Sequence, residues 1–325
     1  MLSRRALLAA AYSPLALAPL AVLASRPARA WEPDRPLSMI VAYAAGGGTD
    51  TAARLLARVL EKQLGQPVVV VNRAGAGGEI GFTELARARP DGLTIGFVNT
   101  PAIVTVPIER PARFTLESFS FIANIVDDPG GLWVLTASPI KSLEDLLAEA
   151  RRRPGEVSYG TTGIGSDDHL AMLALERATG TSFLHVPFAG SSQVRTALFG
   201  RTIELAVVNM GEGITDWRQG VVRPLGQLAT RRWDAAAEVP TLRELGHDVV
   251  EGSMRGLAAP AGLPPEVLAR LAEATRRAVA TPEFLAGAQQ QLLPLRFLGP
   301  EAYTAELQAL RANYGRLWAQ HPWKE

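Results

Sequence analysis

The chain of 325 residues is 47% hydrophobic and 20% charged, which is ordinary globular composition and long enough for two domains with separate cores. Its formal charge is +1, and removal of the four arginines of residues 1–30, which hold no acid, leaves a mildly acidic body at −3. Such a body without a basic cluster argues against nucleic-acid binding, and the absence of cysteine excludes disulfides, thiolate zinc sites and cysteine nucleophiles.

Residues 1–30 have the pattern of an export signal. A positive end at Arg4-Arg5 precedes an apolar run rich in Ala and Leu, and residues 28–30 (ARA) carry small residues where signal peptidase cleaves. We expect cleavage after Ala30, by the secretory or the twin-arginine route, and a periplasmic mature protein. A membrane anchor is the alternative, but two prolines interrupt the apolar run.

The segment after Trp31 predicts alternating strands and helices. Strands are expected over residues 37–43, 68–71 and 93–98, and helices over 49–64 and from about 79 to 89. Thr49 or Asp50 can cap the first helix, and Gly65 can end it. The four valines of 68–71 are typical of a central parallel strand. This alternation predicts parallel strands with right-handed crossovers.

The rest of the chain predicts the same two kinds of element. Strands are expected over residues 121–126, 132–137, 157–159, 184–186, 203–208 and 254–259, and helices from 142, 166, 192 and 265 and over 300–319. Ser142 with Asp145, and Thr241 with Glu244, have the spacing of capping boxes. Because no flexible linker is present, we expect two α/β domains that are joined by strands and enclose a cleft.

Three glycine-rich turns each follow a predicted strand and open a predicted helix. They are 44–50 (AAGGGTD), 72–78 (NRAGAGG) and 160–166 (GTTGIGS). Ligands of open α/β sheets bind at this end of the strands, where helix N-termini present free N–H groups and partial positive charge. The turns therefore predict an anion held by amides and waters. A tight turn without a ligand is the alternative for each, since none matches a P-loop or G-x-G-x-x-G.

The sequence offers little for catalysis. Its four histidines, His169, His185, His247 and His321, lack metal-ligand spacing, and no G-x-S-x-G elbow is present. We expect His169 to lie near a ligand or to be packed, and His185 to be a core histidine. The prediction is a protein that is not an enzyme and uses no metal or cofactor, with an exported α/β hydrolase as the lesser alternative.

Short motifs follow one another through nearly all of the mature chain. They are 41–50 (VAYAAGGGTD), 71–78 (VNRAGAGG), 86–92 (ARARPDG), 159–166 (YGTTGIGS) with 169–170 (HL), 185–190 (HVPFAG), 239–241 (VPT) with 244–246 (ELG), and 256–262 (GLAAPAG). This ordered set resembles the Bug-type periplasmic substrate-binding proteins of the tripartite tricarboxylate transporter family.

The resemblance implies a two-domain α/β periplasmic binding protein fold of type II, which closes on its ligand like a flytrap. The crossing strands would be 132–136 and 254–259, with domain 1 formed by 31–133 plus 256–325 and domain 2 by 134–255. It further implies a monomeric solute receptor that captures a small organic carboxylate and delivers it to a membrane permease. A sensor for signalling without transport is the alternative.

The resemblance also implies which residues bind the ligand. The first two glycine turns would hold one carboxylate through amides and bridging waters, and the third turn would hold the distal end. The implied residues are Tyr43, Gly46, Gly47, Thr49, Asp50, Asn72, Gly75, Gly77, Gly78, Thr161, Thr162, Gly163, Ser166, His169, Phe188 and Asn209.

The chain departs from the family pattern at two places. Its first turn reads Tyr43-Ala44-Ala45 with three glycines, instead of a Pro-Phe type run with two. Asn209 stands where the family often has an acid that can meet an amino group. This leads to the hypothesis of a carboxylic acid ligand without an ammonium group. Tight binding of aspartate or glutamate, with no binding of simple dicarboxylates, would overturn it.

Overall fold

The computed structural model describes residues 31–323, and from Trp31 onward the chain forms one compact unit. The predicted export signal, its twin-arginine pair and its cleavage point after Ala30 lie outside the described residues. Within the described range, every helix is too short or too polar to cross a bilayer.

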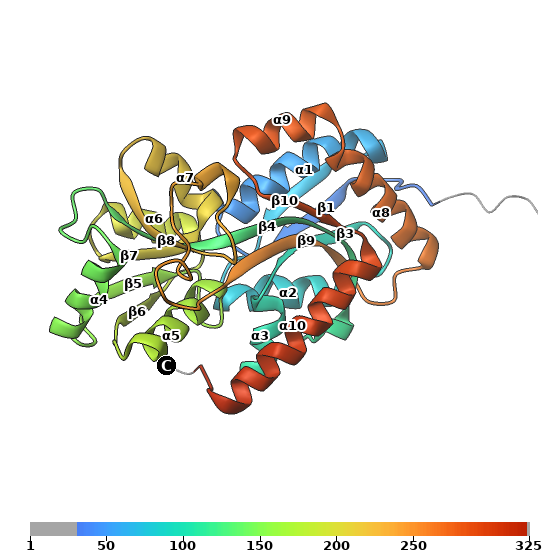
Figure 1. Ribbon diagram of the computed structural model, residues 1–325. Coiled ribbons are helices and arrows are strands. Elements are labelled where there is room, and N and C mark those ends of the chain that lie inside the picture. Colours follow the sequence, from blue (N-terminus) through green and yellow to red (C-terminus); the bar gives the residue numbers. More distant parts are fainter. Residues whose placement is uncertain (1–30, 324–325) are drawn as a thin grey trace, which may run out of the picture. The chain divides into compact units, whose positions relative to one another are not determined.

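A ten-stranded sheet runs through this unit, with helices packed on its faces (Figure 1). The strands are β1 (Leu37–Val41), β2 (Val68–Asn72), β3 (Thr94–Asn99), β4 (Phe119–Leu135), β5 (Ser158–Thr161), β6 (Leu184–Pro187), β7 (Leu205–Asn209), β8 (Val222–Leu228), β9 (Gly252–Pro260) and β10 (Leu295–Leu298). The helices are α1 (Gly48–Leu64), α2 (Glu79–Ala86), α3 (Ala102–Glu109), α4 (Leu143–Arg152), α5 (Asp167–Thr179), α6 (Ser191–Phe199), α7 (Met210–Arg218), α8 (Pro265–Val279), α9 (Pro282–Gln290) and α10 (Pro300–Gln320).

The predicted parallel start of the chain is confirmed, with one correction. β1 pairs in parallel with both β2 and β3. However, β2 is not central: the strand order β2-β1-β3-β9-β4-β7-β5-β6 places it at an edge, and Val69 is 52% exposed. A run of β-branched residues favours a strand, but it does not distinguish an edge from a centre.

The start of α1 also differs from the prediction. Its N-cap is Gly47, with no side-chain cap, and Thr49 and Asp50 lie inside its first turn. The end is as predicted, because Gly65 adopts the left-handed conformation there (φ 67°). The side chain of Asp50 instead accepts the Gly46 N–H at 2.9 Å, which fixes the turn before the helix.

The two strands predicted over 121–126 and 132–137 are one long strand, β4. Its first part, up to Pro129, pairs with β9, and its second part, from Gly130, pairs with β7 and β8. We call the sheet made by β1, β2, β3, β9, β10 and the first part of β4 the first half-sheet, and the remainder the second half-sheet. The change of partner falls slightly before the predicted crossing at 132–136.

Each half-sheet has apolar side chains packed on both faces. In the first half-sheet, α1, α8 and α9 cover one core, and α2, α3 and α10 cover another (Figure 1). In the second, α4 and α5 contribute to one core, and α6 and α7 to another. Leu170 of α5 packs into the core of α2, α3 and α10, so the two half-sheets also meet through apolar contact.

The predicted helix caps have mixed outcomes. Ser142 accepts the Asp145 N–H at 3.1 Å and Ser166 accepts the His169 N–H at 3.2 Å, as expected. Thr241 and Glu244 form both bonds of a capping box, but the segment makes a turn and not a helix. The sequence reasoning missed α3, α7, α9, β8 and β10, whose short lengths give little periodicity.

Candidate functional site

A small cavity lies where β1, β3, β7 and β9 bring residues of both half-sheets together, and we call it the central cavity. Its volume is about 20 Å³, room for about one water molecule. Six predicted site residues line it: Tyr43, Gly47, Thr49, Thr162, Ser166 and Asn209. The other lining residues, which the sequence reasoning did not select, are Gly48, Asn99, Thr100, Ala102, Asp167, Ser191, Glu212, Ser253 and Arg255.

The two half-sheets touch around this cavity. Ala44 donates its N–H to Ala189 O at 3.2 Å, and Ser192 Oγ donates to Ala45 O at 3.1 Å. A Cβ atom added at Gly163 would lie 3.0 Å from Gly77 Cα, so these two turns approach too closely for a side chain. An organic acid is larger than one water, and it can enter the cavity only if these contacts separate.

Asp50 and Asn72 hold the first two glycine turns together. The buried Asp50 carboxylate accepts hydrogen bonds from Gly46 N, from Arg54 Nε at 3.0 Å and from Asn72 Nδ2 at 2.9 Å. Asn72 Nδ2 also donates to Tyr43 O at 3.0 Å. Burial alone would raise the pKa of Asp50, but these hydrogen bonds lower it on balance. Both residues are thus engaged beside the cavity and do not line it.

The N-terminus of α1 already binds a carboxylate of the protein itself. Glu212 Oε1 accepts the Gly48 N–H at 3.0 Å and the Ser191 hydroxyl at 2.9 Å. Its other oxygen, Oε2, accepts the Asn209 N–H at 3.2 Å and so caps α7. The glycine-rich backbone of the first turn therefore contacts an anion of the predicted kind, supplied by α7 of the second half-sheet.

Arg255 lies beside Glu212 and is 1% exposed. Its Nη2 donates to Asn209 Oδ1 at 2.8 Å and lies 3.2 Å from both Asp128 Oδ2 and Glu212 Oε1. Asn209 Nδ2 in turn donates to Asp167 Oδ2 at 2.7 Å. Although Asn209 is not an acid, the site still contains acids, because the carboxylates of Asp167 and Glu212 line the same cavity.

The charges around the cavity are unbalanced. Four buried carboxylates (Asp128, Asp167, Asp168 and Glu212) surround the single guanidinium of Arg255. Burial raises the pKa of Asp128 to about 7 and that of Asp167 to about 6, and it raises the pKa of Asp168 well above its ordinary value. Burial would lower the pKa of Arg255, but the carboxylates raise it on balance, so Arg255 stays charged.

The third glycine turn satisfies its own amides. Thr162 donates its N–H and its hydroxyl to Asp168 Oδ2, at 3.2 and 2.8 Å. Gly163 N donates to Thr161 Oγ1, and Gly165 N donates to His169 Nδ1, both at 3.2 Å. The turn predicted to hold the distal end of a ligand therefore has its N–H groups directed to side chains of the same segment.

His169 is 3% exposed and stacks on His185 with ring centroids 4.3 Å apart. Burial, with a smaller contribution from His185, lowers the pKa of His169 to about 3, and burial lowers that of His185 to about 4. Both rings are neutral near pH 7. His169 supports the third turn through Gly165 and does not line the central cavity.

The remaining predicted residues lie outside the cavity. Gly77, Gly163 and Phe188 line a neighbouring groove of about 530 Å³ together with Arg110. The others, Gly46, Gly75, Gly78 and Thr161, lie in the turns behind the cavity wall, where positive φ angles at the three glycines and the hydrogen bonds of Thr161 shape the loops.

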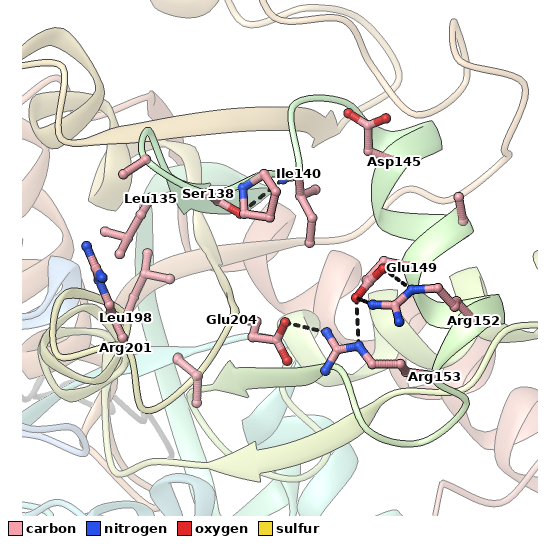
Figure 2. A pocket seen from close by; sticks show the side chains of 14 residues that line it. Leu135, Ser138, Ile140, Asp145, Glu149, Arg152, Arg153, Leu198, Arg201 and Glu204 are labelled. Carbon is pink, nitrogen blue, oxygen red and sulfur yellow. Dashed lines mark hydrogen bonds and ion pairs between the residues drawn. The ribbon is translucent and has the colours of Figure 1, made fainter.

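Another groove, of about 680 Å³, lies within the second half-sheet near α4 (Figure 2). Four of its charged side chains pair with one another: Arg153 lies 2.6 Å from Glu149 and 2.7 Å from Glu204, and Arg152 also pairs with Glu149 (Figure 2). None of the glycine turns reaches it. The central cavity is the better candidate although it is far smaller, because backbone and side-chain donors of both half-sheets converge there.

Metal binding gains no support from the described part of the chain. Residues 31–323 contain no group of three or more His, Asp or Glu side chains arranged to hold a metal ion. The acids around Arg255 instead contact a guanidinium, an amide and backbone N–H groups.

Comparisons with known proteins bear on this site. Residues 52–292 match the family described as "Tripartite tricarboxylate transporter family receptor". The chain is 35% identical to BugT of Bordetella pertussis over 246 residues, covering 74% of each chain. It is 34% identical over 266 residues to a Cupriavidus necator protein described by its place in the gbd 5' region, covering 81% of each chain.

Solved structures are similar over nearly the whole described range. The periplasmic binding protein BugD is 28% identical, with a TM-score of 0.84 over 90% of this chain and 99% of that one. MatC from Rhodopseudomonas palustris with bound malate is 25% identical, with a TM-score of 0.81 over 87% and 99%. An R. palustris protein with adipate is 26% identical, with a TM-score of 0.82 over 88% and 97%.

Proposed function

The chain belongs to the tripartite tricarboxylate transporter receptor family, and we propose that it captures a small organic carboxylate between its two half-sheets and delivers it to a membrane permease of that transporter type. The observation that carries the proposal is the convergence on one carboxylate at the central cavity. Gly48 N–H, the Ser191 hydroxyl and Arg255 all lie within 3.2 Å of Glu212 Oε1.

The relatives support a carboxylate ligand. Malate and adipate are bound by two structures that share this fold at 25% and 26% identity. Both are organic acids, and the donors of the central cavity suit a carboxylate group. Members of the family are receptors, which supports a role in binding without catalysis, in the periplasm.

We further propose the two domains and their joint. Residues 31–129 with 252–325 would form one domain and 130–251 the other, close to the boundaries at 133 and 256 that the resemblance implies. The change of strand partners at Pro129-Gly130 and at Gly252 supports a hinge at these positions. Separation of the halves there would open the central cavity, and closure on the ligand would follow from tighter binding to the closed form.

The proposed ligand contacts are a subset of those the resemblance implies. Tyr43, Gly47 and Thr49 would contact the acid from the first half-sheet, and Thr162, Ser166 and Asn209 from the second. The other implied residues, such as Asp50 and His169, would position these loops through the hydrogen bonds described above. A monomeric receptor and a permease partner complete the proposal.

A thermal-shift screen tests this function. Residues 31–325 would be expressed without the export signal and exposed to mono-, di- and tricarboxylates, aromatic acids, amino acids, sugars and nucleotides. Acid at about a hundred times its dissociation constant stabilises a protein by roughly 2.7 kcal/mol, so one acid class should raise the Tm by several degrees. No change in Tm with any acid, together with a rise in Tm with a sugar or a nucleotide, would contradict the proposal.

A further inference from the structure

Arg255 carries unpaired donors at the central cavity. Its side chain is 1% exposed, and only Nη2 forms a hydrogen bond. Nε and Nη1 have no hydrogen-bond partner among residues 31–323. Burying a guanidinium donor without an acceptor is costly, so such a donor suits an acceptor group that a ligand brings to the cavity. Nε–H and Nη1 point in different directions from the guanidinium, so one carboxylate can pair with the free Nη1 but not with both free donors.

Glu212 marks where a carboxylate binds beside those donors. Its Oε1 lies within hydrogen-bond distance of Gly48 N and Ser191 Oγ, and 3.2 Å from Arg255 Nη2. A Cβ atom added at Gly48 would lie 2.5 Å from both Arg255 Nη1 and Glu212 Oε1, so the free nitrogen lies against the same turn. The donors come from α1, α6 and β9, and therefore from both half-sheets.

No comparable place exists for a second carboxylate in the third turn. The N–H groups of Thr162, Gly163 and Gly165 already donate within the turn. Asp167 lines the cavity, and the buried Asp168 follows it directly. A second negative group on a ligand would therefore meet carboxylates on that side, where a neutral or donor group would be accepted.

We propose that the ligand's carboxylate takes the position of the Glu212 carboxylate, on Gly48 N–H, the Ser191 hydroxyl and the free Nη1 of Arg255. Glu212 is then an internal competitor that the ligand displaces, and Arg255 determines specificity. The preferred ligand is an acid with one carboxylate. This inference rests on the proposed function, because it names the substrate class and the charged contact of that site.

Acetate rescue of a Glu212→Ala variant tests the carboxylate position without knowledge of the natural ligand. The substitution removes the atoms of one acetate ion from this place. Sodium acetate at high millimolar concentration should raise the Tm of the variant by about 2 °C or more above the same concentration of sodium chloride, with a smaller effect on the wild type. Acetamide should have no such effect.

Two further variants make the rescue specific. Asp216 lies on the same helix and pairs with Arg195 at 2.6 Å, outside the cavity, so Asp216→Ala is the matched control and should not respond to acetate. Adding Arg255→Met to Glu212→Ala should abolish the rescue. Equal acetate shifts in wild type and Glu212→Ala, or a rescue that survives without Arg255, would overturn the assignment.

The isosteric Glu212→Gln variant tests displacement if the alanine variant does not fold. Its affinity for butyrate should exceed that of the wild type by about tenfold or more, and butyrate should bind more tightly than adipate. Weaker or unchanged binding, or a preference for adipate, would overturn the proposal. If wild type binds an acid and no variant behaves as stated, the receptor function stands and this assignment fails. If acetate raises the Tm of Glu212→Ala as stated while no acid changes the Tm of the wild type, the assignment stands and the proposed function fails.

Discussion

The first and third glycine turns have similar sequences but satisfy their N–H groups differently. The first turn contacts a carboxylate of the second half-sheet, because the Gly48 N–H donates to Glu212, 164 residues away in the chain. The third turn is satisfied locally, because Thr162 donates to Asp168 six residues away. A glycine turn before a helix thus indicates an anion, but tertiary structure decides whether that anion is local, from another domain or from a ligand.

An Asp→Asn substitution should lower stability most at Asp50, beside the first turn, and least at Asp168, beside the third. Asp50→Asn should lower the free energy of unfolding by about 2–3 kcal/mol. The amide cannot accept hydrogen bonds from Gly46, Arg54 and Asn72 together, and it loses the ion pair with Arg54. Urea unfolding monitored by circular dichroism would measure this. A loss below about 0.5 kcal/mol would mean that these bonds do not hold the first two turns together.

Gly48→Ala should have the next largest effect and lower the free energy of unfolding by about 1–3 kcal/mol. Its Cβ would lie 2.5 Å from Glu212 Oε1 and Arg255 Nη1. It should also reduce acid binding, which calorimetric titration would detect. Gly315→Ala in α10 is the control, since nothing lies within 4 Å of its Cβ position, and it should be neutral or slightly stabilising. Equal behaviour of the two variants would show that the α1 terminus is not tightly enclosed.

The stability of the protein should fall as pH rises from 6.5 to 8.5. Burial raises the pKa of Glu251 to about 8 and that of Asp128 to about 7, so the folded state keeps protons that the unfolded state has lost. The neutral histidines, buried His169 and half-buried His185, act in the opposite direction only below about pH 6.5.

Glu251→Gln should remove about 2 kcal/mol of that fall while keeping an acceptor for the Tyr314 hydroxyl, which donates to Glu251 at 2.8 Å. Glu238→Gln, which removes one carboxylate at an exposed position, is the matched control. Calorimetric Tm values across this range measure both variants. A stability that rises with pH in wild type would contradict the sign derived from these carboxyl groups.

Asp168→Asn should have the smallest effect, below about 1 kcal/mol at pH 7. Burial first, and then Asp167, raise the pKa of Asp168 well above its ordinary value, so the surroundings favour the uncharged carboxyl group, and its Oδ1 has no hydrogen-bond partner in the described range. An amide reproduces that state and still accepts from Thr162 through its oxygen. A loss as large as that of Asp50→Asn would show that the third turn depends on an ionised carboxylate.

Local sequence signals predicted the framework of the site. The run from 37 to 64 identified strand, glycine turn and helix, because hydrophobic periodicity and turn residues act over short distances. The same reasoning indicated an anion at the N-terminus of α1. It could not identify Glu212 as the source, since nothing local indicates that α7 packs against the first turn.

One signal within the sequence could have indicated more. Arg255 interrupts the apolar strand pattern of residues 254–259, and a charged residue there is rarely buried without a partner or a role. Asp167 and Asp168 were consistent with an ordinary helix start, so their burial at the cleft was not visible. The hypothesis built on Asn209 considered only that position, and the acids reach the cavity from other elements.

A disulfide across the cleft tests the central claim, that the acid enters the central cavity by separating the half-sheets. The chain has no native cysteine, and a Cβ at Gly46 would lie 3.9 Å from Ser192 Cβ, a distance that a disulfide can span, although the φ of 80° at Gly46 strains the new side chain. In the Gly46→Cys/Ser192→Cys protein, an acid that binds wild type should bind the reduced form and not the oxidised form. Equal calorimetric affinity for both forms would place the ligand elsewhere and contradict the account.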